Sequence, residues 1–306
     1  MYYAAAPRVK DERRPGVSVR RAEGSRRARC GNSTLRASIV RASRAAVPEA
    51  PTSSTSSPAD RVEAAFWAGF LRNRNVEAGT ADDGAVPVAG GYAISVAGSL
   101  YQMALAIGST RAVTAEDLTV LAAFYGERGA PVRIELREET LARDGTLLQA
   151  SGYVADEARI TLLEAPAAPV AVDGAFRVQP TGDVATWVSL TSGCFADEPA
   201  AVHVRSAQVG AAAAAALFVA EVDGVPAGGG AVGIAGDTAF LYSGCVSPAY
   251  RGRGVHGALL RARIAFAASR GAARVALKAL AGSPSERSAL REGFTPVATL
   301  RRLHAA

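Results

Sequence analysis

The chain has few cysteines, few histidines and few aromatic residues. Its three cysteines are far apart and include no C-x-x-C pair, so the 306 residues contain neither a disulfide framework nor a zinc-binding pattern. The three histidines, His203, His256 and His304, also lack the spacing of metal ligands. No uncharged apolar run reaches the roughly 20 residues that a membrane span needs. These absences predict a reduced, cytoplasmic protein with no metal ion and no membrane partner.

Most of the positive charge lies at the start of the chain. The net charge is +6, but residues 1–58 hold 12 basic and 4 acidic side chains, against 22 basic and 24 acidic in the remainder. Residues 1–58 are rich in Arg, Ser and Ala without apolar periodicity, which predicts a disordered basic tail. The tail resembles an organelle transit peptide, although its acidic residues disfavour that reading, and the alternative is an extension without function. Because aromatic residues are not interleaved with the arginines, nucleic acid is not an expected partner.

From Asp60 onward the chain alternates between strands and helices. Asp223-Gly224 is a two-residue hairpin signal between two apolar strands. Ser283-Pro-Ser-Glu286 is a capping-box pattern with Pro at the first helical position. In the second half, these signals and the apolar spacing predict the following elements: strand Phe176–Pro180, helix Val184–Gly193, strands Leu217–Val222, Val225–Ile234 and Thr238–Val246, a helix from Val255, strand Arg274–Leu280, a helix from Ser283 and strand Pro296–Leu303.

The same order of elements occurs about 142 residues earlier. The earlier set comprises strand Leu100–Ile107, a helix capped at Thr114, strand Pro131–Leu136, helix Leu141–Gln149 and strand Ala158–Leu163. Each set has an Arg-Gly-Ala after its first helix and a Gly-aromatic pair before its last strand, which favours an internal duplication over chance recurrence. We therefore expect a domain at 59–164, a linker at 165–173 and a second domain at 174–306.

A glycine-rich loop follows the predicted strand that ends at Val246. Ser247-Pro248 ends this strand, and the segment Arg251-Gly-Arg-Gly-Val-His-Gly257 begins a helix. The first turn of a helix presents unpaired backbone N–H groups and the positive end of the helix dipole, and arginines add further donors. This combination predicts a site for phosphate, and best for a pyrophosphate. The segment lacks the GK[ST] of a Walker A loop, and the preceding hairpins do not match a dinucleotide-binding βαβ unit.

The loop and its context resemble the GNAT superfamily of N-acetyltransferases. The V-x-P step at Val246–Pro248 and the R-G-x-G at Arg251–Gly254 match the family signature, and the late Gly293-Phe294 is also typical of it. The resemblance covers residues 174–303 and implies an α/β (α+β) fold with a mixed, mostly antiparallel central sheet flanked by helices. It also implies acetyl-CoA as cosubstrate, with the pyrophosphate bound by the loop. The cofactor-binding residues expected from it are Cys245, Val246, Arg251, Gly252, Arg253, Gly254, Val255, His256 and Gly257.

The sequence departs from the family at two positions. His256 stands where the signature ends in Gly or Ala, and Ala289 stands where a Tyr often protonates the leaving thiolate. In the earlier copy, the place of the loop is taken by Ser109–Thr114, which lacks glycine. We therefore expect that copy to be degenerate, without a second acetyl-CoA site, and to pack on the active copy and help to shape the acceptor pocket.

Acetyl transfer needs a base for the amine and an acid for the thiolate. Glu221 and Tyr242 are weak candidates, because Glu221 also fits a solvated residue before a turn and Tyr242 a core or pocket-lining residue. Cys245 has no nearby base to activate it and is interpreted as a packing residue. His256 is interpreted as a surface residue of the helix N-terminus, and His203 has no partner in the sequence.

The sequence thus favours an acetyl-CoA-dependent N-acetyltransferase acting on the primary amine of a small molecule. The alternative is a non-catalytic acyl-CoA-binding sensor or regulatory module, consistent with the missing Tyr. A nucleic-acid binder with a basic tail is the third interpretation.

Overall fold

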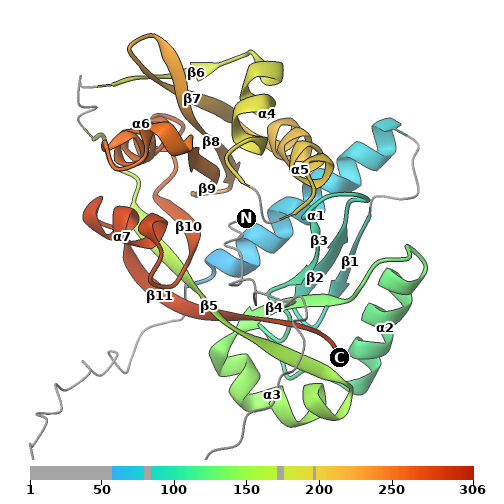
Figure 1. The fold of residues 1–306 in the computed structure, drawn as a ribbon. Coiled ribbons are helices and arrows are strands. Elements are labelled where there is room, and N and C mark those ends of the chain that lie inside the picture. The colour runs from blue at the N-terminus through green and yellow to red at the C-terminus, as the bar shows by residue number, and fades with distance from the viewer. Residues whose placement is uncertain (1–56, 79–83, 171–175, 196–197) are drawn as a thin grey trace, which may run out of the picture. The chain divides into compact units, whose positions relative to one another are not determined.

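The computed structural model describes residues 57–78, 84–170, 176–195 and 198–306 (Figure 1). The predicted tail at 1–58 lies outside the described residues except for its last two positions. The first half of the described chain contains three helices and five strands: α1 (Ala59–Ala78), β1 (Gly84–Val88), β2 (Gly91–Ser95), β3 (Gln102–Leu105), α2 (Ala115–Gly126), β4 (Arg133–Arg137), α3 (Glu138–Ala150) and β5 (Tyr153–Pro166).

The second half repeats this order behind an additional strand and helix. Its elements are β6 (Arg177–Thr181), α4 (Val184–Ser192), α5 (Ala200–Ala213), β7 (Ala216–Val222), β8 (Val225–Ala235), β9 (Thr238–Val246), a 3₁₀ turn at Pro248–Tyr250, α6 (Val255–Ser269), β10 (Arg274–Leu280), α7 (Pro284–Arg291) and β11 (Thr295–Ala305). The series from α5 to β11 has the same order as the series from α1 to β5.

Most of the predicted elements are confirmed, with ends that differ by a few residues. Strands β9 and β10 have the predicted bounds, and Thr114 and Ser283 cap α2 and α7 as their sequences indicate. Asp223 and Gly224 both have positive φ, as a two-residue hairpin turn requires. Helices α1 and α5 are not among the predicted elements.

All eleven strands belong to one sheet, in the order β1-β2-β3-β4-β11-β5-β10-β9-β8-β7-β6. The pairs are antiparallel except β3–β4 and β9–β10, so the predicted mixed, mostly antiparallel sheet flanked by helices is confirmed. Within each half, the last strand would be expected beside the strand that precedes it. Instead β11 lies between β4 and β5, and β5 lies between β11 and β10, so the two halves exchange their last strands (Figure 1).

Because of this exchange, the predicted domain boundaries do not separate two independent sheets. The described parts of both halves fall in one structural unit. Strand β5 continues to Pro166, so the first two residues of the expected linker pair with β10. The two halves therefore share a sheet across the position where a linker was expected.

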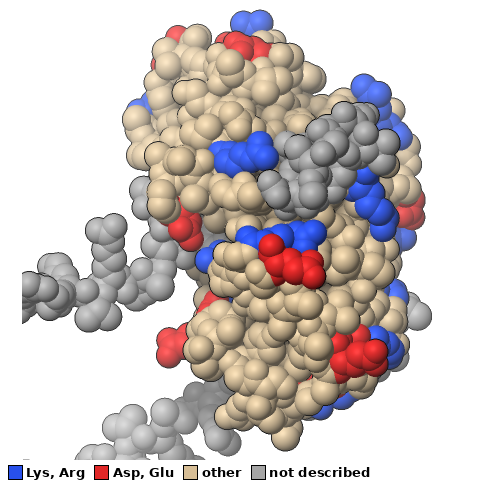
Figure 2. Space-filling view, turned by 90° about the vertical axis from the view of Figure 1, so that its right-hand side faces the viewer, with Lys and Arg blue, Asp and Glu red and all other residues tan. Residues whose placement is uncertain are grey.

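Helices cover both faces of the sheet. Helix α6 packs on one face, against Phe218, Leu241 and Val275 of the strands. Helices α1, α4 and α5 pack on the other face, where Trp67 of α1 and Trp187 of α4 lie in the core. On the face shown in Figure 2, acidic and basic side chains lie in small separate groups, and neither sign forms a continuous patch. Among the described residues, no helix is long and apolar enough to cross a membrane.

Three consecutive glycines in β8 allow both layers of helices to approach the sheet closely. A Cβ on Gly229 would lie 2.8 Å from the Thr191 side chain on α4, and a Cβ on Gly230 would lie 2.7 Å from the Arg263 guanidinium on α6. Successive residues of a strand point to opposite faces, so α4 and α6 meet the same strand from opposite sides. The glycines thus make room for the fully buried Trp187 and Arg263.

Candidate active site

Strands β9 and β10 separate at the middle of the sheet. They pair in parallel over only three residues, from Arg274–Thr238 to Ala276–Phe240. Beyond this point, β9 continues to Val246 and β10 to Leu280 with no ladder pairs between them in the described chain. The splayed strand that the family resemblance implies is therefore present. It leaves the carboxyl-terminal half of β9, including Cys245 and Val246, with a backbone edge that faces the gap.

A β-bulge reshapes β9 within this gap. The register with β8 shifts between Gly229–Cys245 and Ala231–Tyr242, so two residues of β9 oppose one of β8. Ser243, inside the bulge, has a φ of 50°, which is uncommon for a residue other than glycine. Bulges near active sites commonly redirect side chains and backbone groups, and this bulge stands on the strand segment that faces the gap.

The glycine-rich loop connects this strand to α6. Gly252 and Gly254 have φ values of 77° and 89°, so the backbone conformation itself requires glycine at both positions. Gly254 is the N-cap of α6 and provides no side-chain cap. The first helical hydrogen bond runs from the Ala258 N–H to the Gly254 carbonyl. The N–H groups of residues 255–257 thus form an uncapped helix N-terminus at the end of the splayed strand.

The two arginines of the loop differ in their surroundings. Arg251 donates to the carbonyl oxygens of Val246 (3.1 Å) and Cys194 (3.2 Å), so it connects the loop to the end of β9 and to the α4–α5 connection. Arg253 is exposed, with its guanidinium 5.5 Å from the centre of the Tyr250 ring. Both arginines are exposed and can reach an anion, and Arg251 has a structural role in addition to any contact with phosphate.

Side chains of the first turn of α6 point into the protein. Val255 is buried in the core, and a Cβ on Gly257 would lie 2.6 Å from the Glu292 carboxylate. The interpretation of His256 as a surface residue is wrong, because both of its ring nitrogens are buried and lack a hydrogen-bond partner in the described chain. Burial, together with Arg263 and Arg291, lowers the pKa of His256 to about 4, so the ring is neutral at pH 7.

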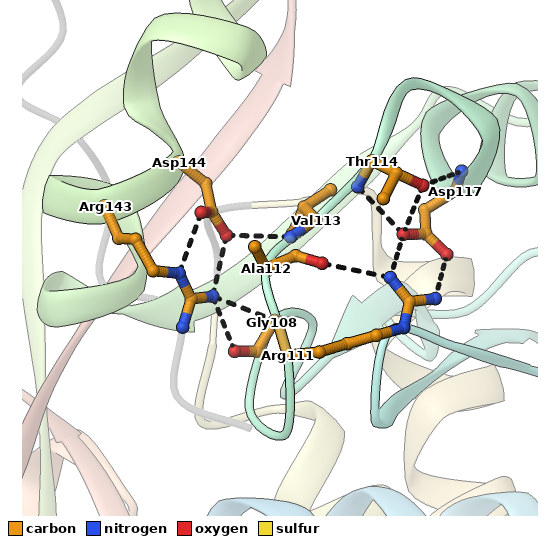
Figure 3. A network of polar contacts seen from close by, with 8 residues as sticks. All are labelled: Gly108, Arg111, Ala112, Val113, Thr114, Asp117, Arg143 and Asp144. Atoms are coloured by element: carbon orange, nitrogen blue, oxygen red, sulfur yellow. Dashed lines mark hydrogen bonds and ion pairs between the residues drawn. The ribbon is translucent and has the colours of Figure 1, made fainter.

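The corresponding loop of the first half is occupied by the protein's own carboxylates (Figure 3). Asp144 accepts from the Val113 N–H (3.0 Å), and Asp117 accepts from the Thr114 N–H (2.9 Å). Thr114 and Asp117 together form a capping box at the start of α2. The Asp117 N–H also donates to the Thr114 hydroxyl (3.3 Å), so three N–H groups at and just before the start of α2 are bonded within the protein, which argues against a second phosphate site there.

Arginines hold both carboxylates in place. Arg111 forms a bidentate pair with Asp117 at 2.6 and 2.7 Å, and Arg143 does the same with Asp144 at 2.8 and 2.7 Å (Figure 3). Arg143 also donates to the carbonyl of Gly108 (2.8 Å). The bond from Arg111, opposed by partial burial, lowers the pKa of Asp117 to about 2.

Replacing Asp117 with asparagine is expected to lower the free energy of unfolding at pH 7 by about 1–2 kcal/mol, the usual scale for a lost helix cap. Because the pKa of Asp117 is lowered in the folded state, its contribution is present above the unfolded value near 4 and disappears as the pH falls towards 2. Denaturant unfolding of parent and Asp117→Asn from pH 7 to pH 2 should show the difference shrinking over this range. Glu116→Gln, an exposed change in the same turn, is the control, and an equal loss in both variants would contradict the assignment.

Two cysteines meet at the end of β9, although they are 51 positions apart in the sequence. Cys194 follows α4, and its thiol is hydrogen-bonded to Cys245 and Ser247. The bond with Cys245 lowers the pKa of Cys194, whereas this bond and burial raise the pKa of Cys245. Cys245 therefore stays a neutral thiol, consistent with a packing residue.

Of the other catalytic candidates, Glu221 lies away from the gap, whereas Tyr242 lines a small cavity between β9 and β10 together with Ala276 and Lys278. Glu221 is paired with Arg177 (3.4 Å), and β8 separates its strand from β9. The Tyr242 hydroxyl is buried and donates to the Gly210 carbonyl (2.9 Å) on α5. Ala289 is fully buried on α7. His203 does have partners, because its Nε2 accepts from the Glu198 N–H (3.3 Å) and its ring stacks on Phe195.

Both halves line a small cavity beside the bulge. Its volume is about 30 Å³, close to the share of one water molecule in the liquid. The first half supplies Leu100 and Tyr101 from the β2–β3 connection, and the second half supplies Phe195, His203 and Ser243 among others. No local pattern in the sequence indicates Tyr101 or Ser243, because their meeting depends on the packing of one half on the other.

A network of buried charged side chains lies on the β10 side of the gap. The Lys278 ammonium on β10 pairs with Glu63 (2.6 Å) on α1 and with Glu135 on β4. Arg302 on β11 also pairs with Glu135 (3.2 Å). Burial alone would raise the pKa of Glu135, but Lys278 and Arg302 lower it to about 2. Four elements from both halves thus meet in three cation–carboxylate pairs, which no local pattern in the sequence indicates.

Comparison with known proteins agrees with this geometry. Residues 185–294 match the model of the acetyltransferase (GNAT) family. A GCN5-related N-acetyltransferase from Kribbella flavida is similar in structure, with a TM-score of 0.59 and 14% identity over 82% of this chain and 96% of that one. A tandem GNAT protein from the clavulanic acid biosynthesis pathway is similar with a TM-score of 0.50 and 13% identity, over 66% of this chain and 73% of that one.

No curated protein matches the sequence at a significant level. The family match nevertheless spans the segment from α4 to the beginning of the last strand, and it includes the splayed strand, the bulge and the uncapped loop. Residues 185–294 of this chain therefore belong to the GNAT acetyltransferase family.

Proposed function

We propose that the chain is an acetyl-CoA-dependent N-acetyltransferase whose acceptor is the primary amine of a small molecule. The observation that carries the proposal is the uncapped N-terminus of α6 at the end of the splayed strand β9. The N–H groups of residues 255–257 would bind the pyrophosphate, with Arg253 adding charge. The backbone of Cys245 and Val246 would contact the pantetheine arm in the gap between β9 and β10.

The reaction forms a C–N bond between the amine and the acetyl carbonyl and breaks the C–S bond to coenzyme A. The bulge at Ser243 would lie beside the carbonyl, where backbone donors can stabilise the developing negative charge. The cavity lined by Tyr101, Phe195 and His203 would mark the approach of the acceptor from the face of α4 and α5. Its lining includes no carboxylate and no arginine, which favours an uncharged group next to the reacting amine.

The alternative, a non-catalytic acyl-CoA sensor, has a specific observation in its favour. Ala289 takes the place of the family Tyr, Glu221 is paired with Arg177 at a strand that β8 separates from β9, and the Tyr242 hydroxyl is bonded to the Gly210 carbonyl. Release of thiol from acetyl-CoA in the presence of mixed primary amines separates the two proposals. Amine-dependent release supports the enzyme, and tight binding without release supports the sensor.

Titration calorimetry with acetyl-CoA tests the cofactor site. We expect micromolar binding by the parent and a loss of at least about tenfold in Gly254→Glu, equivalent to about 1.4 kcal/mol, because the carboxylate would repel the pyrophosphate. Gly236→Glu is the matched control, since Gly236 also has a positive φ but lies in the β8–β9 turn. Equal affinities of the two variants would refute the placement of the cofactor.

A further inference from the structure

The first half reaches the bulge of β9 through a rigid connection between β2 and β3. The Ser99 hydroxyl donates to the Val96 carbonyl (2.8 Å), and the Tyr101 N–H donates to the Ser99 hydroxyl (3.1 Å). The Leu100 N–H donates to the Ser206 hydroxyl (2.9 Å) on α5, in the other half. This connection is therefore held internally and is also anchored on a helix beside the active site.

The Tyr101 side chain extends from this connection to the bulge. It is 3% exposed, its ring centre lies 4.3 Å from that of Trp67, and its hydroxyl is hydrogen-bonded to the Ser243 side chain. On α5, a Cβ on Gly210 would lie 3.0 Å from the Tyr101 hydroxyl and 3.5 Å from that of Ser243. The close packing of three elements fixes the direction of the Tyr101–Ser243 bond.

Ser243 needs such a contact because of its backbone conformation. A serine at a φ of 50° is held in a sparsely populated region, and conformations of this kind persist only where the surroundings determine them. The Ser243 hydroxyl is bonded to Tyr101, a residue of the first half. The conformation of the bulge thus depends on a side chain that lies outside the segment matched by the GNAT family.

We propose that Tyr101 is a positioning residue that fixes the bulge of β9 for the acyl group of the cosubstrate, acting through Ser243. This inference rests on the proposed function. The first half thereby completes the acyl site in addition to covering it. Direct proton transfer from Tyr101 is disfavoured, because burial and the nearby Glu63 raise the pKa of the phenol despite its bond to Ser243. A phenol held neutral in this way is a poor acid for a thiolate.

Tyr101→Phe tests the proposal because it removes the hydroxyl and keeps the ring. We expect kcat to fall about 5- to 10-fold, the scale of one lost hydrogen bond. The KM for the amine and the shape of the pH–rate profile should not change. The matched control is Tyr125→Phe, which removes another buried hydroxyl that donates to a backbone carbonyl, that of Ile94 at 3.1 Å. Ser243→Ala should reproduce the effect of Tyr101→Phe, and the double variant should be no slower than either single variant.

A binding measurement separates this inference from the proposed function. Calorimetry should show that the parent and Tyr125→Phe bind acetyl-CoA more tightly than coenzyme A, and that Tyr101→Phe reduces this preference. A reduced preference supports the positioning role even if no amine is acetylated, in which case only the proposed function fails. An unchanged preference in Tyr101→Phe, or a kcat equal to that of Tyr125→Phe, would overturn the inference.

Discussion

Replacing Lys278 with methionine is expected to lower the free energy of unfolding by about 3–5 kcal/mol, the scale measured when one partner is removed from a buried ion pair. The ammonium lies between Glu63 and Glu135, and all three side chains are at most 16% exposed. Without Lys278, Glu135 still has Arg302 as a partner, whereas Glu63 loses the ammonium that neutralises its poorly solvated charge. Glu135 would also lose part of the stabilisation that keeps its pKa near 2.

Urea denaturation of the parent and of Lys278→Met measures this difference. Arg159→Met is the control, because Arg159 pairs with Glu138 at the surface, where both side chains are at least 40% exposed and such pairs contribute only about 0–1 kcal/mol. A triple variant that also carries Glu63→Gln and Glu135→Gln should recover part of the loss, since no uncompensated carboxylate would remain at these positions. Similar stabilities for Lys278→Met and Arg159→Met would show that the network does not stabilise the fold.

A chain that begins at residue 174 is expected not to fold, although it contains the whole segment that matches the GNAT family. Strand β10 would lose its neighbour β5, and β11 would lose both β4 and β5. The central part of the sheet would then be missing, and apolar residues of β10 and β11 such as Leu277 and Leu303 would be exposed.

Circular dichroism and the cooperativity of thermal unfolding test this expectation. Co-expression of residues 57–170 with residues 174–306 is the control, because the two pieces together provide every strand of the sheet. We expect the pieces to co-purify and to bind acetyl-CoA. Cooperative unfolding of residues 174–306 alone would contradict the strand exchange.

The elements with local signals could be predicted from the sequence. The capping sequences at Thr114 and Ser283, the Asp-Gly hairpin and the V-x-P step all act over a few residues, and the corresponding helices and strands form where they indicate. The repeat of element order was also visible, because apolar periodicity is a local property. Helix α5 was missed because its many alanines give no clear apolar face.

The parts of the site that depend on distant contacts could not be predicted. The bulge at Ser243, the meeting of Cys194 with Cys245 and the bonds of Lys278 each require elements far apart in the chain to come together. For the same reason, His256 was assigned to the surface, whereas α6 turns it inward. The R-G-x-G motif predicts the position of the loop. The positive φ values of its two glycines, which explain why glycine is needed there, are visible only in the structure.

The exchange of last strands also sets an order for folding during synthesis. Strand β4 can pair with β3, but β5 has no place beside β4 because β11 lies between them, and β11 is the last of these eleven strands to be synthesised. While the second half is translated, the edges of β4 and β5 have no strand partner and are open to wrong pairing. A nascent chain of this kind would depend on chaperones until β11 has been synthesised.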